Sequence, residues 1–414
     1  MARNSHVNQV PAIAGSGSQR VEAPLIVEVC PCYVNLEGET GGVSNIVRQI
    51  CLRLVAAQRH VLLLCGNTEL GRVVAAPGRK EVNEYLTTQV FSQRPHPVLG
   101  PTRSVRAVLR RLPRDCVAHV HTCFSAFTES AMAVLSRRGT PFVFTPHGKL
   151  SAYTMSSRSL SKTLWWSTVA GGCVRRASIV AVSGSAEASL FPSLGLRQPS
   201  VVIPNGYEAP ASPISDVPTS EAPYVLFLGY LDPRKQPEFL VRAFARSRAC
   251  GTHTLVIVGP DTYGHESVVR KTVDLCGMAN RVTIRGPVYG VDKWMLLRHA
   301  ACFCLPSRGE GLPVVLSEAL GAGTPIVYSA ACNFPEIQAQ RAGIELGGFV
   351  EEEWADAIDR VCLQEELRQS MRAAALRMGA ELSWERIVPR WADLYDRVWT
   401  QSGFVHSVSS VGRP

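Results

Sequence analysis

The segment Leu305-Pro-Ser-Arg-Gly-Glu310-Gly-Leu-Pro-Val-Val-Leu-Ser-Glu318-Ala-Leu-Gly-Ala-Gly-Thr-Pro-Ile-Val327 predicts a strand, a tight loop, a short helix and a second strand. The strand is the apolar run over residues 300–305, which ends at a proline. Pro313 suits the first turn of a helix, where its missing N–H needs no partner. The helix is expected to end at Gly321 or Gly323, and residues 325–328 start the next strand.

Glu310 falls in the loop, and Glu318 lies about two turns into the helix at about 3.6 residues per turn. The free N–H groups at the helix start point to the carboxyl edge of the sheet and form an anion site. The amides can bind phosphate and the carboxylates can bind hydroxyls, and a nucleotide sugar offers both groups. The alternative is two solvated carboxylates that the helix dipole favours at this end.

This segment resembles the E-x7-E signature of the retaining GT-B glycosyltransferases, in particular family four. The resemblance implies an α/β fold with two Rossmann-like domains, whose parallel sheets face a central cleft. It also implies that Glu310 contacts the donor sugar and Glu318 its ribose. The amides around Gly311 and Leu312 are expected to bind the departing diphosphate.

A glycine pair follows the first predicted strand. Residues 25–30 form this strand, Gly41 and Gly42 lie in the loop, residues 43–57 fit a helix, and residues 61–65 form a strand. The family places such a pair beside donor phosphate or acceptor, which implies that Gly41 and Gly42 bind donor. A simple tight turn remains the alternative.

Three histidines stand at or near predicted strand ends. His147 follows Thr145-Pro146, and the family's T-P-H-G-like loop implies that it faces the donor sugar and diphosphate. His121 is a weaker candidate, and His119 is expected to be structural. A zinc site on His119 and His121 is not expected, because no third ligand stands at a recognisable spacing and no C-x-x-C occurs.

Cationic side chains are expected to offset the diphosphate charge, since no D-x-D metal motif occurs. The family supplies an arginine directly after a glycine and a lysine five residues later. Here Lys235 stands at the lysine position, but Tyr230 follows Gly229. A tyrosine brings no charge, so one clamp is missing, and Arg234 is a candidate substitute. Gly286, after the strand predicted at 281–285, is a further donor-binding candidate.

The other landmarks of the family are short and occur in the expected order. They are Ser185/Glu187, Pro204-Asn205-Gly206, Cys332-Asn-Phe-Pro-Glu336 and Ser383-Trp384. The predicted organisation is a disordered tail (1–21), an acceptor-side domain (22–208), a Pro/Ser-rich linker (209–222), a donor-binding domain (223–383), a helix returning to the first domain (384–400) and a second tail (401–414).

The composition is that of a globular protein, with 46% apolar and 19% charged residues. The net charge of +9 comes from the first half, since residues 1–220 hold 22 Lys/Arg and 12 Asp/Glu. This excess favours an anionic partner. Residues 101–114 predict a basic helix face, which is either solvated or bound to an anion. The Trp165-Trp166 helix packs on its domain or lies in lipid headgroups.

No secretory signal and no membrane span are expected, and the 13 scattered cysteines indicate reduced thiols. These features predict a cytoplasmic protein, with peripheral association at the inner membrane face as a further expectation. The partners expected are a nucleotide-sugar donor, a saccharide or lipid-linked acceptor and no nucleic acid.

The resemblance implies a metal-independent transferase, without a cofactor, that acts in polysaccharide or glycolipid biosynthesis. Glu310, His147 and Lys235 are its candidate catalytic residues. The alternatives are a nucleotide-sugar epimerase on the same architecture and a non-catalytic nucleotide-sugar or membrane-binding protein.

Overall fold

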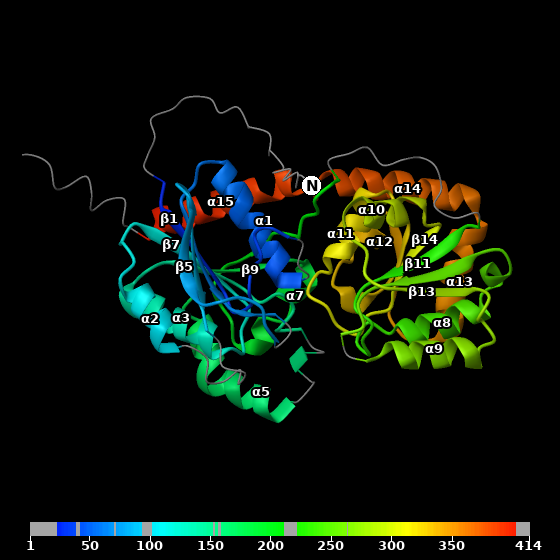
Figure 1. Cartoon of the computed structure of the whole chain (residues 1–414), viewed down its shortest axis with the longest axis horizontal. Helices are drawn as coiled ribbons and strands as arrows, with labels where there is room; N and C mark the ends of the chain where they lie inside the picture. Colours follow the sequence, from blue (N-terminus) through cyan, green and yellow to red (C-terminus); the bar gives the residue numbers. More distant parts are fainter. Residues whose placement is uncertain are drawn as a thin grey trace, which may run out of the picture. The chain divides into compact units, whose positions relative to one another are not determined.

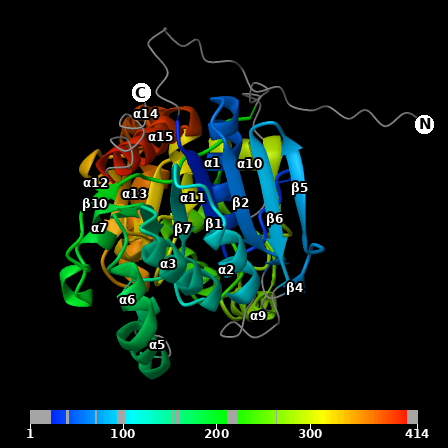
Figure 2. The same cartoon turned by 90° about the vertical axis from the view of Figure 1, so that its left-hand side faces the viewer.

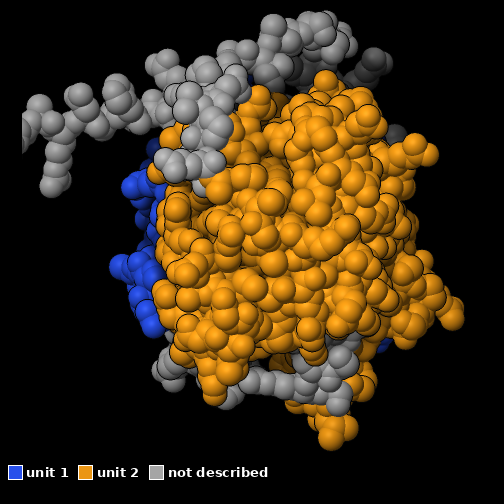
Figure 3. All heavy atoms as spheres, turned by 90° about the vertical axis from the view of Figure 1, so that its right-hand side faces the viewer, with its two compact units in different colours: residues 1–145, 172–180, 388–414 blue, residues 146–171, 181–387 orange. Residues whose placement is uncertain are grey.

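The structure is a computed structural model, and it describes residues 23–38, 42–69, 72–92, 102–151, 154–155, 159–210, 222–262 and 264–402. The chain divides into two compact units, shown in blue and orange in Figure 3. Unit 1 comprises residues 1–145, 172–180 and 388–414, and unit 2 comprises residues 146–171 and 181–387. The domain boundaries expected from the sequence stay a prediction, and most of the predicted tails and linker lies outside the described residues.

The first sheet has eight strands in the order β10-β9-β8-β7-β1-β2-β6-β5. They are β1 (Leu25–Cys30), β2 (Val61–Gly66), β5 (Gly78–Asn83), β6 (Leu86–Phe91), β7 (Cys116–His121), β8 (Phe142–Thr145), β9 (Ile179–Val182) and β10 (Ser200–Val202). Central β1 pairs in parallel with β2 and β7, and β5 is an antiparallel edge strand. A short two-stranded ribbon consists of β3 (Thr68–Glu69) and β4 (Arg72–Val73).

The helices that follow these strands come in the order expected from alternating strands and helices. They are α1 (Gly42–Ala56), α2 (Thr102–Arg110), α3 (Ala126–Arg138), α5 (Ser159–Trp165), the π-helical η1 (Trp166–Ala170), α6 (Gly171–Val174), α7 (Ser185–Ala188) and the 3-10 helix η2 (Pro192–Leu194). Figure 2 shows α2 and α3 beside the strands of this sheet. Ser125 caps α3 by accepting the N–H of Phe127.

The second sheet has six parallel strands in the order β13-β12-β11-β14-β15-β16, which confirms the predicted parallel pairing. Its strands are β11 (Tyr224–Leu228), β12 (Thr254–Val258), β13 (Val282–Arg285), β14 (Cys302–Leu305), β15 (Ile326–Ser329) and β16 (Gly343–Leu346). Strands β14 and β15 are buried throughout. Such continuous burial is typical of a parallel sheet covered on both faces.

Helices cover both sides of the second sheet. Figure 1 shows α10, α11 and α14 on one side of the strands, and α8 and α9 on the other. The helices are α8 (Pro237–Arg246), α9 (Glu266–Leu275), α10 (Gly290–His299), α11 (Val314–Gly321), α12 (Glu336–Ala339), α13 (Glu351–Leu363), α14 (Glu365–Ala380) and α15 (Trp384–Gln401), with 3-10 turns η3 (Arg248–Gly251) and η4 (Ala330–Cys332). The predicted α/β class with two Rossmann-like parallel sheets is therefore confirmed.

One helix ends earlier than the sequence predicts. The sequence pattern predicts one helix over residues 237–250, but α8 ends at Arg246 and the backbone of Ser247 is extended. The carboxylate of Asp359 accepts the backbone N–H groups of Arg248 and Ala249 at 3.0 and 2.8 Å. This carboxylate caps the 3-10 turn that follows α8. Because Asp359 is more than 100 residues away in the sequence, the local sequence pattern could not predict this contact.

All thirteen cysteines are free thiols, and ten of them are buried. This agrees with the reduced thiols expected from their scattered positions. None of the described helices is both long and apolar enough to cross a membrane.

A buried polar network lies in unit 1 around Glu28 of β1. His121 Nε2 lies 2.7 Å from Glu28 Oε2, and Tyr395 of α15 donates to Glu28 Oε1 at 2.9 Å. His119 bridges Tyr395 Oη and Thr145 Oγ1, both at 2.8 Å. Burial raises the pKa of Glu28, but the charges and hydrogen bonds of the two histidines lower it well below its usual range.

This network corrects one step of the sequence argument on zinc. Glu28 is a third potential ligand beside His119 and His121, although it lies far from them in sequence. The three side chains and Tyr395 already satisfy one another by hydrogen bonds, so the arrangement is explained without an ion.

We expect Tyr395→Phe to destabilise unit 1 by about 1–3 kcal/mol, because it leaves buried Glu28 Oε1 without this donor and His119 Nδ1 without its hydroxyl partner. Tyr289→Phe is the matched control, since Tyr289 is 59% exposed. Urea unfolding followed by fluorescence measures both. Equal unfolding midpoints for the two variants would show that the network adds nothing to stability.

Candidate active site

Glu310 lies in the loop between β14 and α11, and its carboxylate forms an ion pair with Lys235. The distance from Lys235 Nζ to Glu310 Oε1 is 2.9 Å, and both side chains are about nine-tenths buried, at 9% and 10% exposure. Arg234 Nη1 lies 3.7 Å from the other carboxylate oxygen. Burial raises the pKa of Glu310, but the positive charges of Lys235 and Arg234 lower it, and the net pKa is below the usual value.

Lys235 is held by the turn that follows β11. The side chain of Asp232 accepts the backbone N–H groups of Arg234 and Lys235 at 2.8 and 2.9 Å, which fixes the turn. The lysine stem runs beside Gly229, where a Cβ would lie 3.7 Å from Lys235 Cδ. The turn thus aims a buried ammonium group at Glu310.

Helix α11 begins directly after this loop, as the sequence predicts. Pro313 is its extended N-cap rather than its first helical residue, and Gly323, with a φ of +73°, follows its end. Glu318 of α11 is 9% exposed, and its Oε1 lies 2.9 Å from Lys293 Nζ of α10. Each of the two predicted carboxylates therefore faces a lysine.

The His147 loop packs on the Glu310 loop, backbone against backbone. His147 and Gly148 both have left-handed φ angles, of +50° and +75°. A Cβ on Gly148 would lie 2.4 Å from Gly311 N, and a Cβ on Gly311 would lie 2.8 Å from Gly148 N. Unit 2 thus brings together His147, Gly311 and the Glu310–Lys235 pair, although about 160 residues separate the two loops.

Two family models match the chain. Residues 40–209 match Glycosyltransferase Family 4, and residues 214–378 match Glycosyl transferases group 1. The chain belongs to glycosyltransferase family 4. The family resemblance of the E-x7-E segment is thereby confirmed.

Curated relatives match part of this family 4 chain in sequence. The D-inositol 3-phosphate glycosyltransferases of Mycobacterium tuberculosis and Mycobacterium bovis are 34% identical to it over 167 residues. The match covers 39% of this chain and about a third, 34%, of each relative.

Solved structures match nearly the whole chain. Sucrose-phosphate synthase from Thermosynechococcus elongatus has a TM-score of 0.72 at 19% identity, over 91% of this chain and 100% of that chain. Anabaena HepE in complex with UDP and glucose has a TM-score of 0.64 at 19% identity, over 90% and 99%. These likenesses show the GT-B fold.

The other site residues that the family resemblance indicated lie in several places. Gly229 and Tyr230 are half-buried after β11, and Gly286 is exposed after β13. Gly42 is the first residue of α1, in unit 1, with a φ of +59°. Gly41 lies outside the described residues.

Several residues that hold this family 4 site together were not predicted as part of it. Asn205 donates to the carbonyl of Leu312 at 2.7 Å, and Asn333 donates to the carbonyl of Glu310 at 2.5 Å. Both asparagines stand in the family landmarks, which could have indicated them. Asp232 had a signal too, since an aspartate two residues before a bound N–H is typical of a turn. Lys293 had none.

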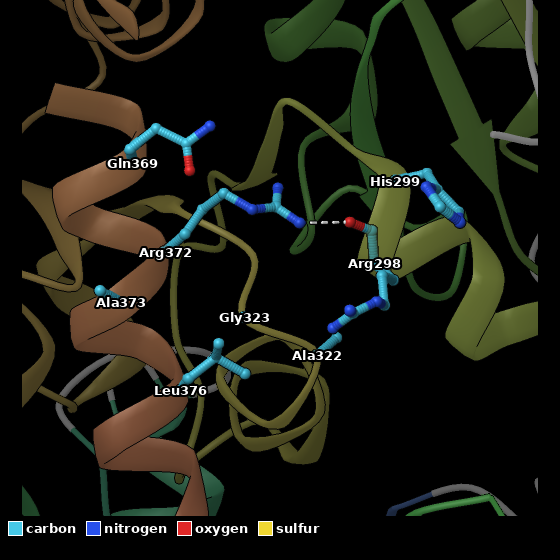
Figure 4. A pocket seen from close by; sticks show the side chains of 8 residues that line it. All are labelled: Arg298, His299, Ala322, Gly323, Gln369, Arg372, Ala373 and Leu376. Atoms are coloured by element: carbon cyan, nitrogen blue, oxygen red, sulfur yellow. Dashed lines mark hydrogen bonds between the residues drawn. The ribbon is translucent and has the colours of Figure 1, made fainter. Parts of the chain in front are cut away.

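A separate hollow lies between the end of α10, the turn after α11, and α14. Figure 4 shows its lining, which is Arg298, His299, Ala322, Gly323, Gln369, Arg372, Ala373 and Leu376. Arg372 donates to the carbonyls of Arg298 and Ala300 at 2.6 and 3.3 Å, which caps the end of α10. None of the predicted site residues lines this hollow.

Proposed function

We propose that this family 4 protein is a retaining, metal-independent glycosyltransferase. It moves a sugar from a nucleotide diphosphate sugar to an acceptor hydroxyl. The observation that carries the proposal is the buried Lys235–Glu310 pair directly before α11. It combines a fixed cation, a carboxylate and helix amides, which suit a diphosphate and a sugar.

The reaction exchanges one bond for another at the anomeric carbon of the donor. The bond from this carbon to the leaving phosphate oxygen breaks, and a bond to the acceptor oxygen forms on the same face. The proton of the acceptor hydroxyl passes to the leaving phosphate. Atoms and charge balance without an added base, so the protein must mainly stabilise the diphosphate and orient both substrates.

The residues of unit 2 divide these tasks. Lys235 offsets the charge that develops on the diphosphate, together with the amides around Gly311 and Leu312. Glu310 orients the sugar hydroxyls, and Glu318 binds the ribose. His147 holds the sugar from its own loop. We propose no metal cofactor, because the lysine and the helix start supply the positive charge.

Two solved structures of similar fold support a nucleotide-sugar donor. One is the trehalose-6-phosphate protein from E. coli bound with UDP-2-fluoro glucose, and the other is Anabaena HepE with UDP and glucose. Their identities to this chain are 13% and 19%, so the base and the sugar used here are left to experiment.

The acceptor that we propose is a saccharide or a lipid-linked sugar at an anionic membrane surface, reached from the cytoplasm. Helix α2 exposes Arg103 and Arg110 while burying Val105 and Leu109. Helix α5 exposes two apolar side chains, Leu160 at 87% and Leu164 at 65%. Basic and apolar surfaces of this kind bind anionic lipid headgroups. They also fit the proposed role in polysaccharide or glycolipid biosynthesis.

Sedimentation with vesicles tests the membrane contact. We expect binding to vesicles rich in anionic phospholipid and none to neutral vesicles, with loss of binding in Leu160→Ser/Leu164→Ser. A protein that stays in the supernatant with both vesicle types, while transferring sugar to a soluble acceptor, would overturn this part of the proposal.

The decisive experiment screens nucleotide sugars by thermal shift and then measures nucleoside diphosphate release. Selective stabilisation identifies the donor. Release that depends on an added acceptor extract supports the transferase. Donor turnover without acceptor would identify the epimerase. Donor binding without turnover would identify a non-catalytic binding protein, the alternative that fits Tyr230 at the position of the family's arginine.

A further inference from the structure

Glu187 is a buried carboxylate to which the proposed mechanism gives no task. It lies in α7 and is 1% exposed. Its Oε1 accepts the backbone N–H of Gly148 at 2.8 Å, across 39 residues of sequence. Burying a carboxylate is costly unless hydrogen bonds favour it, so this contact calls for an explanation beyond local helix capping. The N-cap of α7 is Gly184, which has no side chain to cap the helix.

The loop that Glu187 holds has an unfavourable backbone. His147 adopts a φ of +50°, a conformation that non-glycine residues rarely take. Gly148 continues it at +75° and lies against the backbone of Gly311. A strained conformation persists only where its surroundings enforce it. The hydrogen bond from Gly148 N–H to Glu187 is such a constraint, at the residue next to His147.

Helix α7 is itself fixed to the segment that carries Glu310. A Cβ on Gly184 would lie 2.4 Å from the carbonyl oxygen of Asn333, so the two backbones are in contact. Ser185 Oγ donates to Glu336 Oε1 at 3.0 Å. Asn333 in turn donates to the carbonyl of Glu310. Glu187 thus holds the His147 loop from a base that is anchored on the Glu310 loop.

We propose that Glu187 is a positioning residue for the proposed transfer reaction. Its carboxylate fixes the backbone at His147 and Gly148 against Gly311, and so sets where the His147 ring lies relative to the Glu310–Lys235 pair. The inference rests on the proposed function for its role in transfer. Burial raises the pKa of Glu187 to about 7, and the backbone N–H groups of Gly148 and Ser183 favour its charged form.

The test compares Glu187→Ala, Glu187→Gln and the control Ser193→Ala, since Ser193 is exposed and donates only to the nearby carbonyl of Leu190. We expect Glu187→Ala to lower kcat by about 100-fold, as misplacing a reacting group does. Affinity for the nucleoside diphosphate should change little, since Asp232, Asn333 and Asn205 rather than Glu187 hold the Lys235 turn and the segment of Gly311 and Leu312. Glu187→Gln should restore most of kcat, because its amide oxygen can accept the Gly148 N–H. Ser193→Ala should act like the wild type.

A second measurement separates this inference from the proposed function. The His147 imidazole signal in a two-dimensional NMR spectrum, assigned with His147→Asn, should shift or broaden in Glu187→Ala and return in Glu187→Gln, whether or not the protein transfers sugar. A wild-type protein without transferase activity but with this response would end the proposed function alone. An unshifted His147 signal in a folded Glu187→Ala protein would overturn the positioning role.

Discussion

Lys235→Ala is expected to lower kcat/KM by about 10²–10³-fold, the effect of removing one preorganised charge donor from a developing oxyanion. The side chain of Lys235 is 9% exposed, and Asp232 holds its backbone N–H, so the ammonium group is kept in place. Arg234 is 3.7 Å from Glu310 and 41% exposed, which makes it a poor substitute. Initial rates of nucleoside diphosphate release measure the loss.

The same substitution leaves Glu310 with a weaker partner, so stability must be measured beside activity. Breaking a buried ion pair costs up to about 3–5 kcal/mol. Glu310→Ala removes the other partner and is expected to abolish transfer, and the double variant should recover stability but not activity. Lys271→Ala, at an exposed position of α9, is the control. Unaltered turnover in either single variant would break the assignment.

The sequence predicted the strands and helices around the site well, because each carries its own signal. Residues 224–228 and 254–258 are short apolar runs bounded by proline or glycine, and the structure forms β11 and β12 over these ranges. The E-x7-E segment likewise contains the end of one strand, the proline at the start of the helix and the glycines at the end of the helix, so its elements could be predicted. Local sequence is enough where burial and turn chemistry agree.

The hairpin β5–β6 was not predicted, because its first strand has no apolar pattern. Residues 78–83 are exposed at every position and form an antiparallel edge. An edge strand needs no buried face, so its pairing partner rather than its own composition defines it. The network around Glu28 was not predicted either, because its partners in β7 and α15 lie in distant parts of the chain.

Contacts within the site were also beyond sequence reasoning. The motif gave Glu310, Lys235 and His147 as separate residues, and their roles stay predictions. The packing of Gly148 on Gly311, and the hold of Glu187 on that loop, depend on which segments unit 2 brings together. The spacing of residues along the chain does not predict such contacts.

Gly148→Ala is expected to lower kcat by about 100-fold or more, although it adds one methyl group. The new Cβ would lie 2.4 Å from Gly311 N and 2.6 Å from Gly311 Cα, both backbone atoms that cannot rotate away. Because real Cβ atoms essentially never approach closer than 3.0 Å, the two loops must separate. The separation moves His147 away from the Glu310 loop and displaces the amide of Gly311.

Backbone strain has to be distinguished from this contact, and the chain offers a matched control. Gly148 has a φ of +75°, and Gly277, in the same unit, has a φ of +67° with nothing within 4 Å of an added Cβ. Both alanine variants incur a left-handed strain of roughly 1–2 kcal/mol. Gly277→Ala should therefore lose stability but keep its turnover. If Gly148→Ala also keeps its turnover, then the close packing of the two loops is irrelevant to transfer, because strain alone is common to both variants.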